Sequence, residues 1–261
     1  MDLGLDGETA IVTASSSGLG KGSATALARE GANVVIASRS PDALAAAAED
    51  IRAVATGRVV PAQTDITVPD EIQALVEVTV EEFGGVDHLV TSAGGVPSGR
   101  FGDITEQEWY DAYDMLVMSV VRAVTAARPH LEASDAGTIT AITSTSVREA
   151  IDGLVLSNAV RRGVIGLVKT LARELAPAVR ANAVLPGSHE TPRIEELVEA
   201  AVERGEAASY EEGLEDWAEG IPLGRMGQPS ELGDTVAFLA SDRASFVNGV
   251  SLPVDGGRLR S

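Results

Sequence analysis

Two serines and an arginine stand at spacings that could serve chemistry on a substrate oxygen. Ser144 ends an apolar run, Ser157 stands thirteen residues later, and Arg161 follows four residues after that. Residues four apart share one face of a helix, so the Ser157 hydroxyl and the Arg161 guanidinium would lie side by side. Such groups can polarise a substrate oxygen, although guanidinium does not release a proton in proteins. A structural pair of serines would give the same pattern.

A glycine-containing segment near the N-terminus could hold a phosphate. Residues 13–20 read TASSSGLG, follow the first apolar run and open a helical stretch. Small residues let a phosphate approach the backbone, and a helix N-terminus offers N–H groups and a positive dipole end. A tight structural turn would also explain two glycines, but the position after a first strand favours a pyrophosphate site. The candidate residues are Thr13, Ser15, Ser16, Ser17, Gly18, Leu19 and Gly20.

The elements that must position these groups alternate along the chain. Apolar runs rich in β-branched residues predict buried strands. These strands are Thr9–Thr13, Asn33–Ala37, Arg58–Ala62, Asp87–Val90, Thr138–Thr143, Arg180–Leu185 and Val250–Val254. The stretches between them predict helices at Leu19–Glu30, Ala43–Ala55, Asp70–Phe83, Glu106–Leu131, Leu154–Leu175 and Glu231–Ala240.

This alternation predicts an α/β fold with a doubly wound, seven-stranded parallel sheet of the Rossmann type. Right-handed crossovers place ligands at the carboxyl ends of the strands. Because no linker or repeat interrupts the pattern, we expect a single domain over residues 1–261. The stretch 187–224 carries helical sequence but no strand, so we expect it to form a lid over the site.

Composition excludes several classes of function. Thirty-nine acidic and twenty basic residues give a net charge of -19, which argues against nucleic acid as a partner. Without cysteine there is neither a disulfide nor a thiolate metal site, and the three scattered histidines suggest no metal centre. The lack of a long apolar run predicts a cytoplasmic protein with no membrane partner. The spread acidic excess indicates a halophilic surface, although an ordinary acidic protein would look similar.

The order of these motifs resembles the short-chain dehydrogenase/reductase family over essentially the whole chain, especially its 3-oxoacyl-acyl-carrier-protein reductase-like members. That family carries Thr-Gly-x-x-x-Gly-x-Gly where this chain has Ala14 in place of the first glycine. Further segments resemble its adenine-contacting aspartate, its Asn-Ala-Gly turn and the segment closing over the nicotinamide. These are, in turn, Asp65 with Ile66, then Ser92, Ala93 and Gly94, then Pro186, Gly187 and Thr191. The resemblance implies that they bind a nicotinamide dinucleotide.

Ser38 and Arg39, at the end of the second predicted strand, indicate which dinucleotide is bound. An acidic residue there would bind the ribose 2'-hydroxyl of NAD and repel a 2'-phosphate. Arginine instead offers a planar fork of donors to a phosphate, and serine adds a hydroxyl. NADP is therefore favoured over NAD, while an arginine that merely faces solvent is the alternative.

The resemblance fails at the catalytic residues. Ser144 matches the family's strand-end serine, but Ser157, Arg161 and Leu116 stand where the family has tyrosine, lysine and asparagine. Serine is far too weak an acid to replace the phenol. Arg161 can still replace lysine in charge and in binding the nicotinamide ribose.

Another group must therefore supply the proton. His189, Glu149 and Asp152 stand in flanking loops, and His189 is favoured because histidine exchanges protons near neutrality. We expect an NADP-dependent oxidoreductase of a small carbonyl or alcohol. A non-redox isomerase or lyase and a non-catalytic dinucleotide sensor remain alternatives. The resemblance also implies a homotetramer or homodimer, built through Glu106–Leu131, Leu154–Leu175 and Ser251–Ser261.

Overall fold

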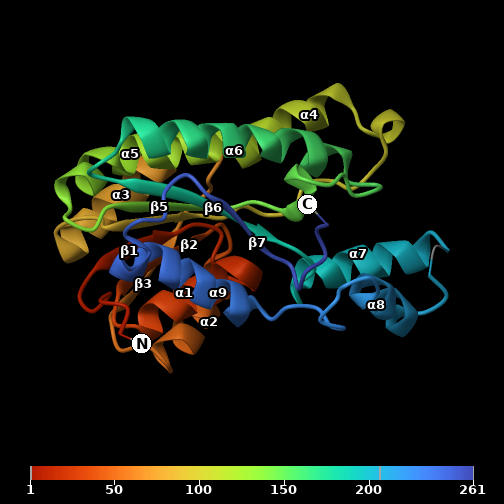
Figure 1. Cartoon of the computed structure of the whole chain (residues 1–261), viewed down its shortest axis with the longest axis horizontal. Coiled ribbons are helices and arrows are strands. Elements are labelled where there is room, and N and C mark those ends of the chain that lie inside the picture. Colours follow the sequence, from red (N-terminus) through yellow and green to blue (C-terminus); the bar gives the residue numbers. More distant parts are fainter. Residues whose placement is uncertain (1, 206, 261) are drawn as a thin grey trace.

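The computed structural model describes residues 2–205 and 207–260, apart from the side chain of Arg193, and contains a seven-stranded sheet (Figure 1). Every neighbouring pair of strands is parallel, in the order β3-β2-β1-β4-β5-β6-β7. The strands are β1 (Thr9–Val12), β2 (Asn33–Ser38), β3 (Val59–Gln63), β4 (His88–Thr91), β5 (Thr138–Ile142), β6 (Arg180–Pro186) and β7 (Ser251–Val254). The predicted doubly wound sheet is confirmed. Its order reverses between β1 and β4, the place where such sheets bind ligands.

Helices cover both faces of this sheet, so the central strands β1, β4 and β5 are buried along their whole length. The helices are α1 (Gly18–Arg29), α2 (Pro41–Arg52), α3 (Pro69–Phe83), α4 (Glu106–Tyr113), α5 (Ser119–Ala133), α6 (Val155–Glu174), α7 (Pro192–Glu203), α8 (Tyr210–Ala218) and α9 (Pro229–Ala240). Helices α3, α5 and α6 pack on one face, and α1, α2 and α9 pack on the other (Figure 1). None of the described helices combines the length and the apolar composition needed to cross a bilayer.

The predicted helix Glu106–Leu131 is helical throughout, but it contains a π-helical turn that was not predicted. Helix α4 ends at Tyr113, a π-helical turn spans Asp114–Met118, and α5 begins at Ser119. The wider turn keeps its apolar residues on the buried face, where Leu116 is 2% exposed. An apolar pattern shows which face of a helix is buried but not how many residues make one turn, so the π-helical turn left no signal in the sequence.

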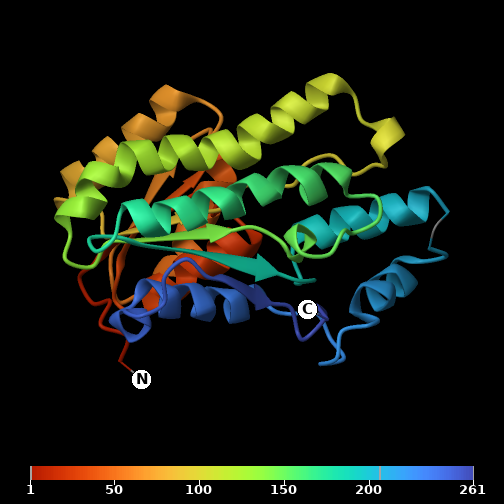
Figure 2. The ribbon, with the colours of Figure 1, turned by 45° about the horizontal axis from the view of Figure 1, so that its top comes forward.

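Helices α7 and α8 lie beyond the carboxyl ends of the strands, to the right in Figures 1 and 2. They pack around a small apolar cluster of their own, formed by Ile194, Val198, Ile221 and Met226. A helical, strand-free segment at 187–224 is thus present where the sequence predicted a lid. Movement of this segment remains a prediction.

Arg180, at the start of β6, ties the sheet to the end of α9. Its guanidinium donates to the carbonyl oxygens of Leu239, Ala240, Ser241 and Val247 at 2.9–3.3 Å. The last carbonyls of a helix lack partners within the helix, so a cation placed there both satisfies and neutralises them. Arg180 therefore fixes the C-terminus of α9 against the sheet.

Candidate dinucleotide and substrate site

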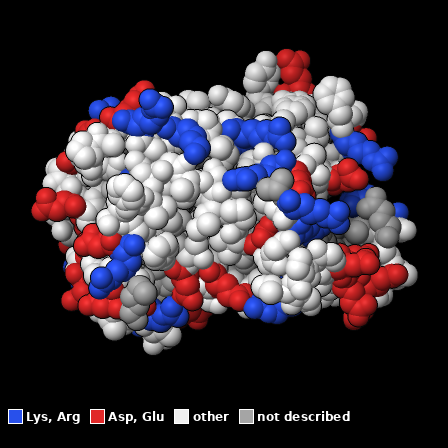
Figure 3. Space-filling view, viewed as in Figure 1, with Lys and Arg blue, Asp and Glu red and all other residues white. Residues whose placement is uncertain are grey.

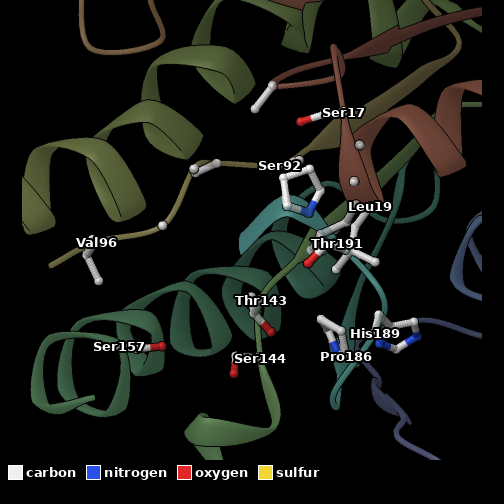
Figure 4. A pocket seen from close by; sticks show the side chains of 18 of the residues that line it. Ser17, Leu19, Ser92, Val96, Thr143, Ser144, Ser157, Pro186, His189 and Thr191 are labelled. Atoms are coloured by element: carbon white, nitrogen blue, oxygen red, sulfur yellow. The ribbon is translucent and has the colours of Figure 1, made fainter. Parts of the chain in front are cut away.

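A cavity of about 580 Å³ opens at the carboxyl ends of the strands, between the sheet and the α7–α8 segment (Figure 4). Its wall includes most of the residues predicted to bind cofactor or substrate. These are Ser16, Ser17, Gly18, Leu19, Gly20, Ser38, Arg39, Asp65, Ile66, Ser92, Ala93, Gly94, Ser144, Ser157, Arg161, Pro186, Gly187 and Thr191. The fold thus brings residues that are far apart in the sequence into one space.

Thr13 and Ser15 lie beneath the glycine turn rather than in the cavity wall. The Thr13 hydroxyl donates to the carbonyl of Ser92 at 2.7 Å and accepts from the N–H of Ser92 at 2.9 Å. The Ser15 hydroxyl donates to the carbonyl of Val12 and accepts from the N–H of Ala37. Both side chains are buried and join the turn to neighbouring strands. Their side chains position the turn, and their contact with a cofactor stays a prediction.

The glycine turn is so tight that Gly20 leaves no room for a side chain. A Cβ on Gly20 would lie 2.3 Å from the carbonyl oxygen of Ala14, which is far inside van der Waals contact. Ala14 itself has φ of 47°, a left-handed conformation that glycine adopts more easily. Ser17 makes no side-chain cap on α1, so it does not occupy the first N–H groups of the helix. These features fit a pyrophosphate at the helix N-terminus.

The end of β2 presents hydroxyls and an exposed guanidinium. The Ser38 and Ser16 hydroxyls lie 2.9 Å apart, and Arg39 reaches the cavity wall beside them. After the neighbouring strand β3, hydrogen bonds from the side chain and backbone of Thr67, together with nearby Arg39, hold the pKa of Asp65 below its usual value. This part of the cavity therefore offers a cation and donors to a phosphate.

The predicted catalytic hydroxyls are joined by a third serine. Ser144 accepts a hydrogen bond from the N–H of Ser146 at 3.1 Å, and the Ser146 hydroxyl lies 3.1 Å from that of Ser157. Ser146 is fully buried, whereas Ser144 and Ser157 line the cavity (Figure 4). Arg161 donates to the carbonyl of Thr143 at 3.4 Å, next to Ser144. Ser144, Ser146, Ser157 and Arg161 are called the serine group below. Sequence reasoning missed Ser146, because its contact with Ser157 depends on the turn that follows β5.

The structure does not support His189 as the proton donor, although the ring lines the cavity. Its Nδ1 lies 3.2 Å from the carbonyl of Gly187, and a Cβ on Gly227 would lie 2.7 Å from the ring. Burial lowers the pKa of His189, and the Gly187 carbonyl, Glu231 and Asp255 only partly oppose this. A neutral ring must donate Nδ1–H to a carbonyl, which leaves Nε2 as an acceptor. The ring is therefore a packed, neutral group near pH 7.

Glu149 and Asp152 are also poor replacements for the missing acid. Both side chains are exposed, and neither lines the cavity. Glu149 accepts a hydrogen bond from the N–H of Arg260 at 3.2 Å. Leu116 is buried in the π-helical turn, so no polar side chain replaces asparagine at that position.

The parallel sheet, the glycine turn at its switch point and the adjoining cavity define a dinucleotide-binding α/β protein of the Rossmann type. A family model described as enoyl-(acyl carrier protein) reductase matches residues 13–258. The chain belongs to the short-chain dehydrogenase/reductase family, as the order of its motifs predicted.

Similar proteins and structures cover the chain almost from end to end. A 3-oxoacyl-acyl-carrier-protein reductase of Thermotoga maritima is 34% identical over 257 residues, which are 97% of this chain and 98% of that protein. An uncharacterized oxidoreductase of Methylorubrum extorquens is 36% identical over 259 residues, with 97% and 98% covered. L-sorbose reductase of Gluconobacter frateurii, solved with NADPH and L-sorbose, superimposes with a TM-score of 0.94 at 30% identity and full coverage of both chains.

Proposed function

We propose that the protein is an NADP-dependent oxidoreductase that interconverts a small carbonyl compound and its alcohol. The observation that carries the proposal is one continuous cavity that joins the glycine turn, the Arg39 guanidinium and the Ser144 hydroxyl. Relatives named as reductases, and a similar structure that holds NADPH, support it. The relatives named above give no comparable support to a non-redox enzyme or a dinucleotide sensor.

The residues of the cavity fit NADP(H). The N-terminus of α1 and the turn before it would hold the pyrophosphate, and Ser38 with Arg39 would bind the 2'-phosphate. Arg161, whose guanidinium lies at the Thr143 carbonyl, would bind the nicotinamide ribose. Thr191 lies close to the turn, since a Cβ on Gly18 would be 3.5 Å from its methyl group, so the α7 segment would cover the bound dinucleotide. When bound, NADPH supplies a hydride for a carbonyl carbon.

The protein's own part in the reaction is to orient and polarise the substrate. The Ser144 hydroxyl, which already accepts a backbone N–H bond, can donate its proton in a hydrogen bond to the carbonyl oxygen. Ser157, held by Ser146, contributes a second hydroxyl beside it. Such donors stabilise the negative charge that develops on oxygen. Because the site has no phenol and His189 is already neutral near pH 7, the oxygen takes its proton from water.

The cofactor part of the proposal is tested by calorimetry with NADPH and NADH at one salt concentration. Wild type should bind NADPH at least about tenfold more tightly, because a charge-assisted bond to the 2'-phosphate is lost with NADH. Arg39→Asp should reverse the preference. Arg58→Asp is the control, since Arg58 pairs with Glu82 at the amino end of β3 and makes no part of the cavity. Equal affinities in wild type would show that Arg39 only faces solvent.

The redox part is tested by following NADPH consumption with a panel of ketones, aldehydes and oxo acids. Wild type should oxidise NADPH with at least one class of carbonyl. Tight NADPH binding without consumption, across the panel, would instead favour a sensor.

A further inference from the structure

Arg258 lies in the cavity wall beside the 187–224 segment and is not among the residues assigned above to the dinucleotide. Its Nη1 donates to the hydroxyl of Ser188 at 3.0 Å and lies 3.5 Å from the carbonyl oxygen of Trp217. All three residues line the cavity. Ser188 lies at the start of the 187–224 segment and Trp217 belongs to α8, so the guanidinium joins two parts of this segment to the turn that follows β7.

The contacts of Arg258 use only one edge of the guanidinium. Among the described residues 2–205 and 207–260, Nε and Nη2 of Arg258 make no hydrogen bond, and Arg258 forms no ion pair. These two nitrogens form a planar fork that matches the two oxygens of a carboxylate. The half-buried cation is thus held in place with its carboxylate-binding edge unused.

A rigid turn aims this side chain. Gly256 and Gly257 have φ of 64° and 86°, and a Cβ on Gly256 would lie 2.6 Å from the side chain of Ile221. Asp255 accepts hydrogen bonds from the N–H groups of Gly257 at 3.0 Å and Leu259 at 2.8 Å. Arg258 therefore follows a turn that is fixed on both sides, and the position of its side chain is not that of a loose C-terminal residue.

The charge around the cavity makes this cation unusual. The chain carries a net charge of -19, yet the described cavity wall holds three arginines against Asp65 and Glu196. Arg39 belongs to the 2'-phosphate region and Arg161 to the serine group, which leaves Arg258 for another anion. On the face shown in Figure 3, acidic side chains crowd the α8 corner, while basic side chains gather around the C-terminal end. His189 on the same wall is neutral near pH 7, because burial lowers its pKa.

From this geometry we infer that Arg258 and Ser188 form a subsite for the carboxylate of the substrate, so that the protein acts on an oxo acid or the corresponding hydroxy acid. The inference rests on the proposed reductase function and specifies its substrate class. The carboxylate occupies the Nε–Nη2 edge of Arg258 at the lid, while the carbonyl group of the same molecule meets the Ser144 hydroxyl. A guanidinium–carboxylate pair on a partly desolvated wall discriminates strongly against a neutral analogue.

The first test compares acids with their esters. Pyruvate, acetoacetate and levulinate are each compared with their methyl esters as substrates for NADPH oxidation. We expect the best acid to exceed its ester in kcat/KM roughly tenfold to a hundredfold, the value of a hydrogen bond to a charged group. In Arg258→Met this ratio should fall to about one. Arg58→Met, which removes the same charge far from the cavity, should keep the wild-type ratio. Esters used as well as acids, with Arg258→Met changing neither, would overturn the inference while leaving the reductase proposal intact.

The second test needs no turnover. Butyrate is titrated into the NADPH-loaded protein while cofactor fluorescence is followed, with butyramide as the neutral probe. Wild type and Arg58→Met should show a saturable response to butyrate and none to butyramide, and Arg258→Met should lose it. A saturable butyrate response in a protein that reduces nothing would support the subsite and contradict the reductase function. No response in wild type would overturn the subsite, as would an Arg258→Met variant that fails to bind NADPH.

Discussion

The Ser157 hydroxyl has a buried partner. That contact bears on whether the site is simply a family catalytic site that lacks its tyrosine. Ser157 lies 3.1 Å from the hydroxyl of Ser146, which no solvent reaches. A tyrosine at this position would break the contact and fill space that is now part of the cavity. We therefore interpret the serine group as an arrangement in which Ser157 has a partner of its own, rather than as a catalytic site with one group removed.

A double substitution tests this reading of the serine group. Ser157→Tyr with Arg161→Lys restores the family pattern, and we expect kcat/KM for the best wild-type substrate to fall at least about tenfold, because the phenol occupies substrate space. NADPH affinity, measured in parallel, should change much less, since lysine keeps the charge of Arg161. A gain in activity toward simple ketones would show instead that the wild-type site lacks only an acid.

His189 should make the stability of the protein depend on pH. Its pKa lies below the unfolded value of about 6.5, so between the two values the unfolded chain binds more protons. The free energy of unfolding therefore falls as pH drops below about 6.5 and is fully retained above it. Urea unfolding at about pH 8 and about pH 5.5 should show a larger acid loss in wild type than in His189→Gln. Parallel losses in both proteins would mean that His189 titrates in the fold as it does in the unfolded chain.

The sequence predicted which residues lie together in the cavity better than it predicted what each of them does there. The motifs placed Ser144, Ser157 and Arg161 correctly in one cavity wall. They could not show that Ser157 bonds to Ser146 or that His189 packs on Gly227, because both contacts depend on loop conformation. Arg258 carried one signal, its position directly after a double-glycine turn, which sequence reasoning did not use.

At the scale of elements, apolar runs rich in β-branched residues predicted each strand that the structure describes. The central strands are buried, whereas the edge strands β3 and β7 are only partly so. The π-helical turn at Asp114–Met118 was not predictable, because the buried face continues through it. The hydrogen bonds of Arg180 could not be predicted from the sequence either. Its carbonyl partners on α9 and the segment after it lie about sixty residues further along the chain.

Arg180 provides the test at this scale. Arg180→Met removes the donors to the last carbonyls of α9 and leaves those oxygens buried without partners. We expect the free energy of unfolding to fall by roughly 2–4 kcal/mol, as for other broken buried networks. Arg243→Met, which removes one exposed bond to the Asp2 carbonyl, should cost less than about 1 kcal/mol in the same urea titration. Similar losses in the two variants would contradict the capping role.

For the molecule as a whole, the acidic surface predicts a response to salt. A net charge of -19 creates repulsion that reaches about 10 Å at 0.1 M salt and about 3 Å at 1 M. The melting temperature should therefore rise between about 0.1 M and about 2 M KCl, as expected of a halophilic protein. A flat or falling curve would contradict the halophilic interpretation without affecting the fold. Light scattering in the same buffers would show whether the homotetramer or homodimer expected from the family forms.

The central claim is that this protein transfers a hydride although it lacks the family's phenol. NADPH carrying deuterium in both positions on C4 of the nicotinamide is mixed with wild type and the best carbonyl of the panel, and the product is analysed by mass spectrometry. The account predicts deuterium on the carbinol carbon for each NADPH oxidised, and a strong loss of rate in Ser144→Ala while NADPH binding persists. NADPH that stays unoxidised at saturation with every carbonyl, or is oxidised without label in the product, would contradict it.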